Sequence, residues 1–121
     1  MQSYKMWIDG KPVDSLSGKT YTVVNPATEE EIARILLGDK ADAERAVEAA
    51  HKALPTWLKK SQAERAQIMN KIAAALHEHS EELINLEVLD HGTPIGIATG
   101  MNPQGAHGFE WGAQVIWKMP I

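Results

Sequence analysis

The segment Ala43-Glu44-Arg45-Ala46-Val47-Glu48-Ala49-Ala50-His51-Lys52-Ala53-Leu54 marks the point where the chain changes from strands to helices. Its apolar residues recur with a period of about 3.6 residues, while charged residues occupy the other face, and this pattern predicts an amphipathic helix over residues 40–54. Pro55 should end the helix, which leaves Trp57 in a short connection, because a helix seldom continues through the residue before a proline. The elements on either side of this helix then decide the fold.

Short β-rich runs separated by turn residues occupy residues 5–37, ahead of the helix. Asp9-Gly10 is a turn dipeptide between two such runs, so a hairpin is predicted there. A run over residues 20–24 must stop near Asn25-Pro26, because proline has no amide proton to donate. A further strand is expected over residues 32–37. The first third of the chain is therefore predicted to be strands.

Helical patterns resume after residue 60. Ser61-Gln62-Ala63-Glu64 has the form of a capping box and predicts a helix over residues 62–91, with a bend or short break where Ser80 could act as a new cap. Gly92 suits the left-handed position after a helix end, and Pro94 should prevent resumption. Asn102-Pro103 then predicts a last helix over residues 103–118, because the many glycines before it disfavour an earlier start.

Composition narrows the classes of protein that this chain can belong to. It has 121 residues, 44% of them hydrophobic and 23% charged, which is typical of a soluble globular segment. The formal charge of -4 without a basic stripe argues against a nucleic-acid partner. No apolar stretch reaches the roughly 18 residues of a membrane span, so a soluble, cytoplasmic protein is expected. The absence of cysteine removes disulfides, thiolate zinc sites and thiol nucleophiles.

The residues that could carry chemistry form no recognisable active site. His77 and His79 would point to nearly opposite sides of a helix and cannot share one metal, whereas His91 and His107 have no identifiable second histidine or carboxylate at ligand spacing. No glycine pattern of a dinucleotide-binding or phosphate-binding loop is present. The tryptophans are interpreted as core or interface anchors. Several carboxylates look like solvated surface groups: Asp9, Asp14, Glu81, Glu82, Glu87 and Asp90.

Six local matches follow one another along the chain: Trp7-Ile8-Asp9-Gly10-Lys11, Val24-Asn25-Pro26-Ala27-Thr28-Glu29-Glu30-Glu31-Ile32, residues 42–50, Trp57, Glu64-Arg65-Ala66 and Leu89-Asp90-His91-Gly92-Thr93-Pro94. In this order they resemble the opening of the NAD(P)-dependent aldehyde dehydrogenases. That family has an "I-D-G-x" turn, then "V-N-P-A-T-x-E-x-I", a first helix, a tryptophan in a connection, a second helix start and an "L-D-x-G-x-P" string. Each match alone is weak, but together they cover nearly all of residues 5–94 at family-like spacing.

The resemblance implies an α/β fold in which residues 1–121 are the incomplete N-terminal segment of a Rossmann-like cofactor-binding domain. In the full-length enzyme a cysteine thiolate would attack an aldehyde substrate, hydride would pass to NAD or NADP, and a carboxylic acid would be released. None of those motif positions falls in this stretch, so no catalytic and no cofactor-binding residue is assigned here. The expected partners are the remainder of the dehydrogenase chain and further copies in a homo-oligomer.

The resemblance also suggests a monovalent cation site. Some family members bind such an ion through carbonyl oxygens near the "N-P" strand and an acidic side chain after "G-x-P", and the matching positions here are Val24 and Asn102. Two other functions are weighed beside the dehydrogenase segment. One is a free-standing helical interaction or oligomerisation module that binds through Trp111 and Trp117. The other is a small hydrolase that uses histidine and a carboxylate.

Overall fold

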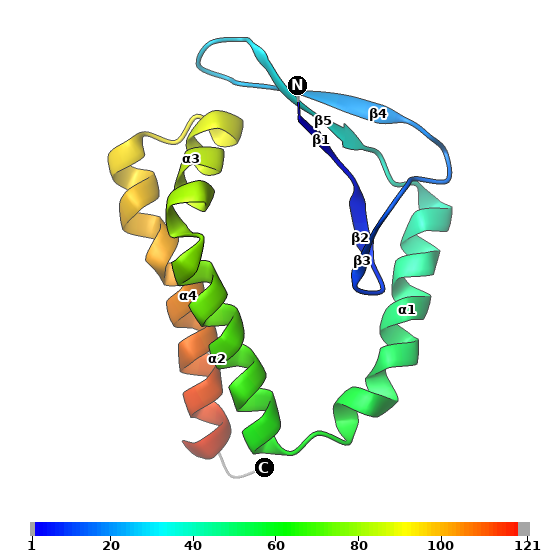
Figure 1. The fold of residues 1–121 in the computed structure, drawn as a ribbon, viewed down its shortest axis with the longest axis vertical. Helices are drawn as coiled ribbons and strands as arrows, with labels where there is room; N and C mark the ends of the chain where they lie inside the picture. Colours follow the sequence, from blue (N-terminus) through cyan, green and yellow to red (C-terminus); the bar gives the residue numbers. More distant parts are fainter. Residues whose placement is uncertain (1, 119–121) are drawn as a thin grey trace. The chain divides into compact units, whose positions relative to one another are not determined.

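Glu31–Leu36 (β5) is the central strand of a three-stranded sheet in the first of two units into which the chain divides, residues 1–59 and residues 60–121 (Figure 1). The computed structural model describes residues 2–118. Thr20–Val24 (β4) pairs with β5 in the antiparallel sense and Gln2–Tyr4 (β1) pairs with its other edge in the parallel sense. β1 was not predicted, because three exposed residues carry no alternating pattern.

The predicted hairpin at Asp9-Gly10 is confirmed. Met6–Ile8 (β2) and Lys11–Val13 (β3) pair in the antiparallel sense around it. Both turn residues have positive φ, 56° at Asp9 and 71° at Gly10. Positive φ at both positions of a two-residue loop matches the right-handed twist of the strands, which explains why this dipeptide makes a tight turn.

The predicted helix over residues 40–54 is present but extends further, as Lys40–Leu58 (α1). The prediction that Pro55 ends it is wrong, and Trp57 lies in the helix rather than in a connection. The proline lies close to the end of α1, where it removes a single backbone hydrogen bond and its ring crowds the preceding turn. Figure 1 shows α1 bending in its last turns, as this crowding requires.

The second unit begins with the predicted capping box. Gln62–Glu78 (α2) starts after Ser61, whose hydroxyl accepts from the Glu64 amide at 3.2 Å, while Glu64 accepts from the Ser61 amide at 2.7 Å. The expected break near residue 80 is also confirmed, since α2 ends and Ser80–His91 (α3) begins around His79. Gly92 follows α3 with φ 74°, the left-handed cap that its lack of a Cβ permits.

The last helix is longer than predicted. Ile95–Lys118 (α4) begins directly after Pro94, whose carbonyl accepts from the Ala98 amide at 3.0 Å. As predicted, α3 does not resume through Pro94. Proline is nevertheless compatible with the start of a new helix, where its missing amide proton is not needed. Asn102-Pro103 lies inside α4 and does not cap it. The cost of the α4 glycines is offset by packing, because α4 runs back alongside α2 and α3 (Figure 1).

A seam of small side chains joins the helices of the second unit. Within the described residues the buried apolar side chains are all alanines, and only one of them, Ala33, belongs to the sheet. The others are Ala66 and Ala73 on α2, and Ala98, Ala106 and Ala113 on α4. Small residues let two helix backbones approach closely, so the seam fixes which faces of α2 and α4 meet.

The observed elements confirm the predicted α/β class, with strands followed by helices. In the part of the chain that the structure describes, none of the helices combines the length and the apolar character that crossing a bilayer demands.

Candidate functional site

Val24, one of the two residues suggested for a cation site, ends β4 in the first unit. The ladder between β4 and β5 is irregular at Val23 and Val24. The buried Asn25 closes the connection that follows. Its backbone amide donates to the Glu30 carbonyl at 2.9 Å, and its side-chain oxygen accepts from the Ala27 backbone amide at 2.9 Å. The chain around Val24 is therefore held in a defined turn.

Asn102, the other suggested residue, lies in the second unit on α4. Its side-chain oxygen accepts a hydrogen bond from the Ser80 hydroxyl at 2.7 Å. The predicted role of Ser80 as a helix cap is wrong, because α3 has no side-chain cap and Ser80 instead ties the start of α3 to α4. Asn102 also lines a pocket of about 250 Å³, together with Glu87 and Thr93. An amide oxygen has a second lone pair, so it can still accept another partner.

The pocket beside Asn102 has a polar wall. The Thr93 hydroxyl donates to the Glu87 carboxylate at 2.8 Å, and His91 Nδ1 lies 2.9 Å from the same hydroxyl oxygen. The prediction that His91 has no carboxylate at ligand spacing is therefore wrong, because Glu87 lies beside it. Val24 and Asn102 belong to separate units, so the cation site stays a prediction from the resemblance.

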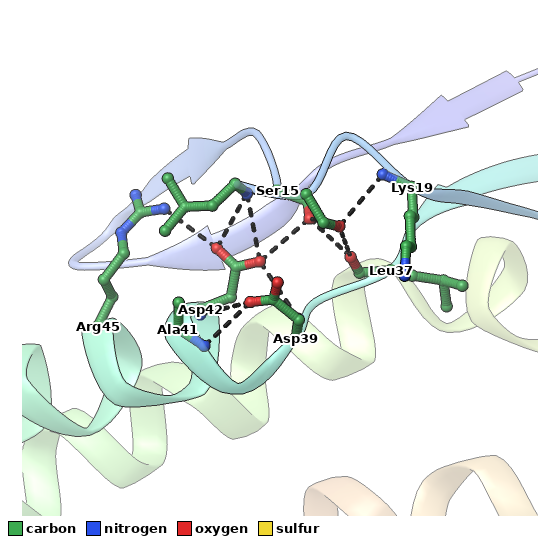
Figure 2. Close-up of polar contacts among 9 residues, drawn as sticks. Ser15, Lys19, Leu37, Asp39, Ala41, Asp42 and Arg45 are labelled. Carbon is green, nitrogen blue, oxygen red and sulfur yellow. Dashed lines mark hydrogen bonds and ion pairs between the residues drawn. The ribbon is translucent and has the colours of Figure 1, made fainter.

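Asp42, which the sequence did not single out, lies at the centre of a polar network in the first unit (Figure 2). Asp42 is only 2% exposed. The carboxylate accepts from the Ser15 hydroxyl at 3.0 Å, from the Leu16 amide at 3.2 Å and from Arg45 at 3.1 Å. These contacts join the loop after β3 to the first turn of α1. Asp39-x-x-Asp42 is also a reciprocal cap of α1, a signal present in the sequence.

Ser15 and Leu37 complete this network. The Ser15 hydroxyl lies 2.6 Å from the Leu37 carbonyl and 3.0 Å from Asp42, so its one proton can serve only one of the two at a time. Burial alone would raise the pKa of Asp42, but hydrogen bonds from Leu16, Asp39 and Ser15 and the charge of Arg45 outweigh it and lower that pKa. A carboxyl held ionised in this way is a poor general acid, so the network is a structural tie.

His77, His107 and Glu110 come together in the second unit. His77 Nε2 lies 3.1 Å from Glu110 Oε1, and the rings of His77 and His107 meet edge to face with centroids 6.1 Å apart. Their possible ligand atoms all lie within 4.8 Å of one another. The prediction that His107 has no second histidine or carboxylate within ligand distance is therefore wrong. The spacing of His107 and Glu110 on one helix face was visible in the sequence, but the partner from α2 was not.

His79 has a different carboxylate neighbour from His77. Its Nδ1 lies 3.3 Å from Glu82 Oε2, on the first turn of α3. The two histidines of the His-x-His pair thus have different carboxylate neighbours, in keeping with their opposite directions from the end of α2.

Comparison with known proteins gives a consistent result. A sequence model described as "Aldehyde dehydrogenase family" matches residues 13–120. A 3-sulfolactaldehyde dehydrogenase from Pseudomonas putida is 40% identical over 108 residues, which are 89% of this chain and 22% of that protein.

Solved structures agree with the sequence match. The crystal structure of PnpE in complex with nicotinamide adenine dinucleotide has a TM-score of 0.91 and 36% identity, and the match covers 100% of this chain and 26% of that one. A NAD-dependent aldehyde dehydrogenase from Sinorhizobium meliloti gives a TM-score of 0.88 and 34% identity, covering 93% of this chain and 23% of its own. The chain thus spans between a fifth and about a quarter of the length of these relatives.

Proposed function

Since the chain belongs to the aldehyde dehydrogenase family, we propose that it forms the N-terminal part of the cofactor-binding domain of an enzyme that oxidises an aldehyde to a carboxylic acid with NAD or NADP. One observation carries the proposal: the family match runs over residues 13–120, almost the whole chain, while the solved relatives continue well beyond it. The nucleophilic thiolate would come from outside these 121 residues, which contain no cysteine.

The exposed apolar surface supports a role as part of a larger protein. Trp111 and Trp117 on α4 are 68% and 64% exposed, and Ile95, Ile97 and Met101 on the same helix are also exposed. Large apolar side chains that are exposed along one helix are commonly covered by another protein surface. The remainder of the dehydrogenase chain is the partner that would bury them.

The test compares the 121-residue chain with the full-length gene product from the same source. Each is incubated with NAD or NADP and a panel of aldehydes, and formation of the reduced nicotinamide is followed by its absorbance. The proposal expects turnover by the full-length protein and none by the short chain. Turnover by the cysteine-free chain, or a full-length product that reduces neither cofactor with any aldehyde, would show the proposal to be wrong.

A second candidate function is a free-standing helical interaction or oligomerisation module derived from the same family. The exposure of Trp111 and Trp117 favours it, because Trp is enriched at the anchor positions of protein interfaces. If the native product ends at Ile121 and is monodisperse, Trp111→Ala with Trp117→Ala should abolish its binding to a full-length dehydrogenase or to itself. A native product that continues past Ile121 into a cysteine motif would exclude this candidate.

A further inference from the structure

The cluster of His77, His107 and Glu110 offers two ring nitrogens and a carboxylate oxygen from two adjacent helices. His107 and Glu110 lie three residues apart on α4 and therefore share a face. His77 comes from the last turn of α2. This donor set of imidazole and carboxylate is the one that Zn²⁺ and its neighbours in the first transition row prefer, whereas Mg²⁺ and Ca²⁺ prefer oxygen alone.

The backbone positions of the three residues are fixed by the alanine seam. His77 follows the buried Ala73 by one turn, and Glu110 follows the buried Ala106 by one turn. The packing that presses α2 against α4 thus also turns His77 and Glu110 toward each other. Ligands carried on packed helices are better positioned than ligands carried on loops, which favours a site at this edge of the seam.

The distances require only side-chain adjustment. In a tetrahedral zinc site with bonds of roughly 2.0–2.2 Å, neighbouring ligand atoms lie about 3.4 Å apart. His77 Nε2 and Glu110 Oε1 are already 3.1 Å apart, and all three ligand atoms lie within 4.8 Å of one another. The side chains of His77 and Glu110 are 46% and 40% exposed, so they can rotate by the small amount that remains.

We propose that His77, His107 and Glu110 bind one divalent transition-metal ion of the Zn²⁺ type, with water in the fourth position. The ion bridges α2 and α4 and stabilises their pairing, because a ligand that binds only the folded state shifts the unfolding equilibrium. Its imidazole ligands distinguish this site from the monovalent cation site suggested by the resemblance, which would use oxygen ligands alone.

The test titrates ZnCl₂ into the full-length protein by calorimetry and compares wild type with His107→Ala and Glu110→Gln. His79→Ala is the matched control, because His79 is also an exposed histidine beside one carboxylate at the end of α2. Zinc sites elsewhere in the protein contribute equally to every variant and cancel in the comparison. CoCl₂ then reports the ligand geometry through its visible absorption.

The proposal expects wild type and His79→Ala to bind one Zn²⁺ ion at this site with equal affinity. His107→Ala and Glu110→Gln should weaken that affinity by at least roughly tenfold, because loss of even a supporting group commonly costs that much. Circular dichroism shows that each variant remains folded. ZnCl₂, but not MgCl₂, should raise the melting temperature of wild type. Identical Zn²⁺ stoichiometry and affinity in wild type, His107→Ala and Glu110→Gln would overturn the proposal.

Discussion

Gly108→Ala and Gly112→Ala are a matched pair that tests the close approach of α2 and α4. Both glycines lie in the interior of α4. Alanine is favoured over glycine in a helix by about 1 kcal/mol, so each substitution gains this amount if the added methyl has room. A Cβ at Gly108 would meet nothing within 4 Å. We therefore expect Gly108→Ala to raise the free energy of unfolding by about 0.5–1 kcal/mol.

Gly112→Ala should lack this gain. A Cβ at Gly112 would lie 2.5 Å from Met69 Cε and 3.6 Å from Met69 Sδ. The methionine methyl must then turn away, and an unfavourable side-chain torsion costs roughly 0.5–1.5 kcal/mol. The cost cancels most of the helix gain, which leaves Gly112→Ala close to wild type and about 1 kcal/mol below Gly108→Ala. That difference corresponds to about 4–8 °C in Tm for a unit of this size.

Urea unfolding of the 121-residue chain, followed by far-ultraviolet circular dichroism and by tryptophan fluorescence, measures both variants. Combining each with Met69→Ala completes a double-mutant cycle, which isolates the clash from the loss of Met69 itself. The cycle should give a coupling of about 1 kcal/mol with Gly112→Ala and none with Gly108→Ala. Equal stabilisation by the two substitutions, with no coupling to Met69, would refute the packing argument.

Three further predictions concern Asp42, Gly92 and Asn102. Because the pKa of Asp42 is lowered below its ordinary 3.8 in the folded state, its contribution to stability is complete above that pH and is lost as the pH falls through the lower folded value. Asp42→Asn should flatten this acid limb of the free energy of unfolding, and an unchanged limb would contradict the assignment. Gly92→Ala should destabilise the chain by about 1 kcal/mol in urea unfolding, since φ there is 74°; a neutral result would argue against the left-handed cap. In the full-length enzyme Asn102→Asp should lower the K⁺ concentration needed for half-maximal activity, because a carboxylate attracts a cation more strongly than an amide, and identical K⁺ dependence in Asn102→Asp and Asn102→Ala would remove Asn102 from the cation site.

Elements set by adjacent residues could be predicted from the sequence. Asp9-Gly10 specifies its tight turn through the positive φ that both residues accept. Ser61 and Glu64 specify the start of α2 through hydrogen bonds within four residues, and Gly92 specifies the end of α3. In each case the physical cause is local, so the pattern alone contained it.

Predictions failed where packing outweighed local preference. Pro103 lies inside α4, although it removes a backbone hydrogen bond. The glycines of α4 should weaken it, yet the helix begins at Ile95 because its alanines pack on the helices before it. Propensity contributes at most about 1 kcal/mol per glycine, which the burial of a whole helix face can exceed.

The His77, His107 and Glu110 cluster shows the same limit at the level of a site. His107 and Glu110 share a helix face by spacing alone, but His77 is 30 residues away from His107 and meets it only because α4 runs back along α2. The register of the pairing between α2 and α4 depends on which small residues form the seam. A local sequence pattern does not predict that register. A site made by two helices thus becomes visible only after their packing is known.

The alanine seam provides the second unit with little hydrophobic stabilisation of its own. Alanine buries little area, and at about 25 cal/mol per Å² it contributes much less than a leucine or a tryptophan would in the same place. The large apolar side chains of α4, among them Trp111 and Trp117, instead lie on the exposed faces. Close backbone approach therefore sets the geometry of the helix pair, whereas most of the available hydrophobic stabilisation is left for surfaces beyond it. This distribution, with alanines buried and large apolar side chains exposed, supports the proposal that the remainder of a longer chain covers the exposed faces of α4.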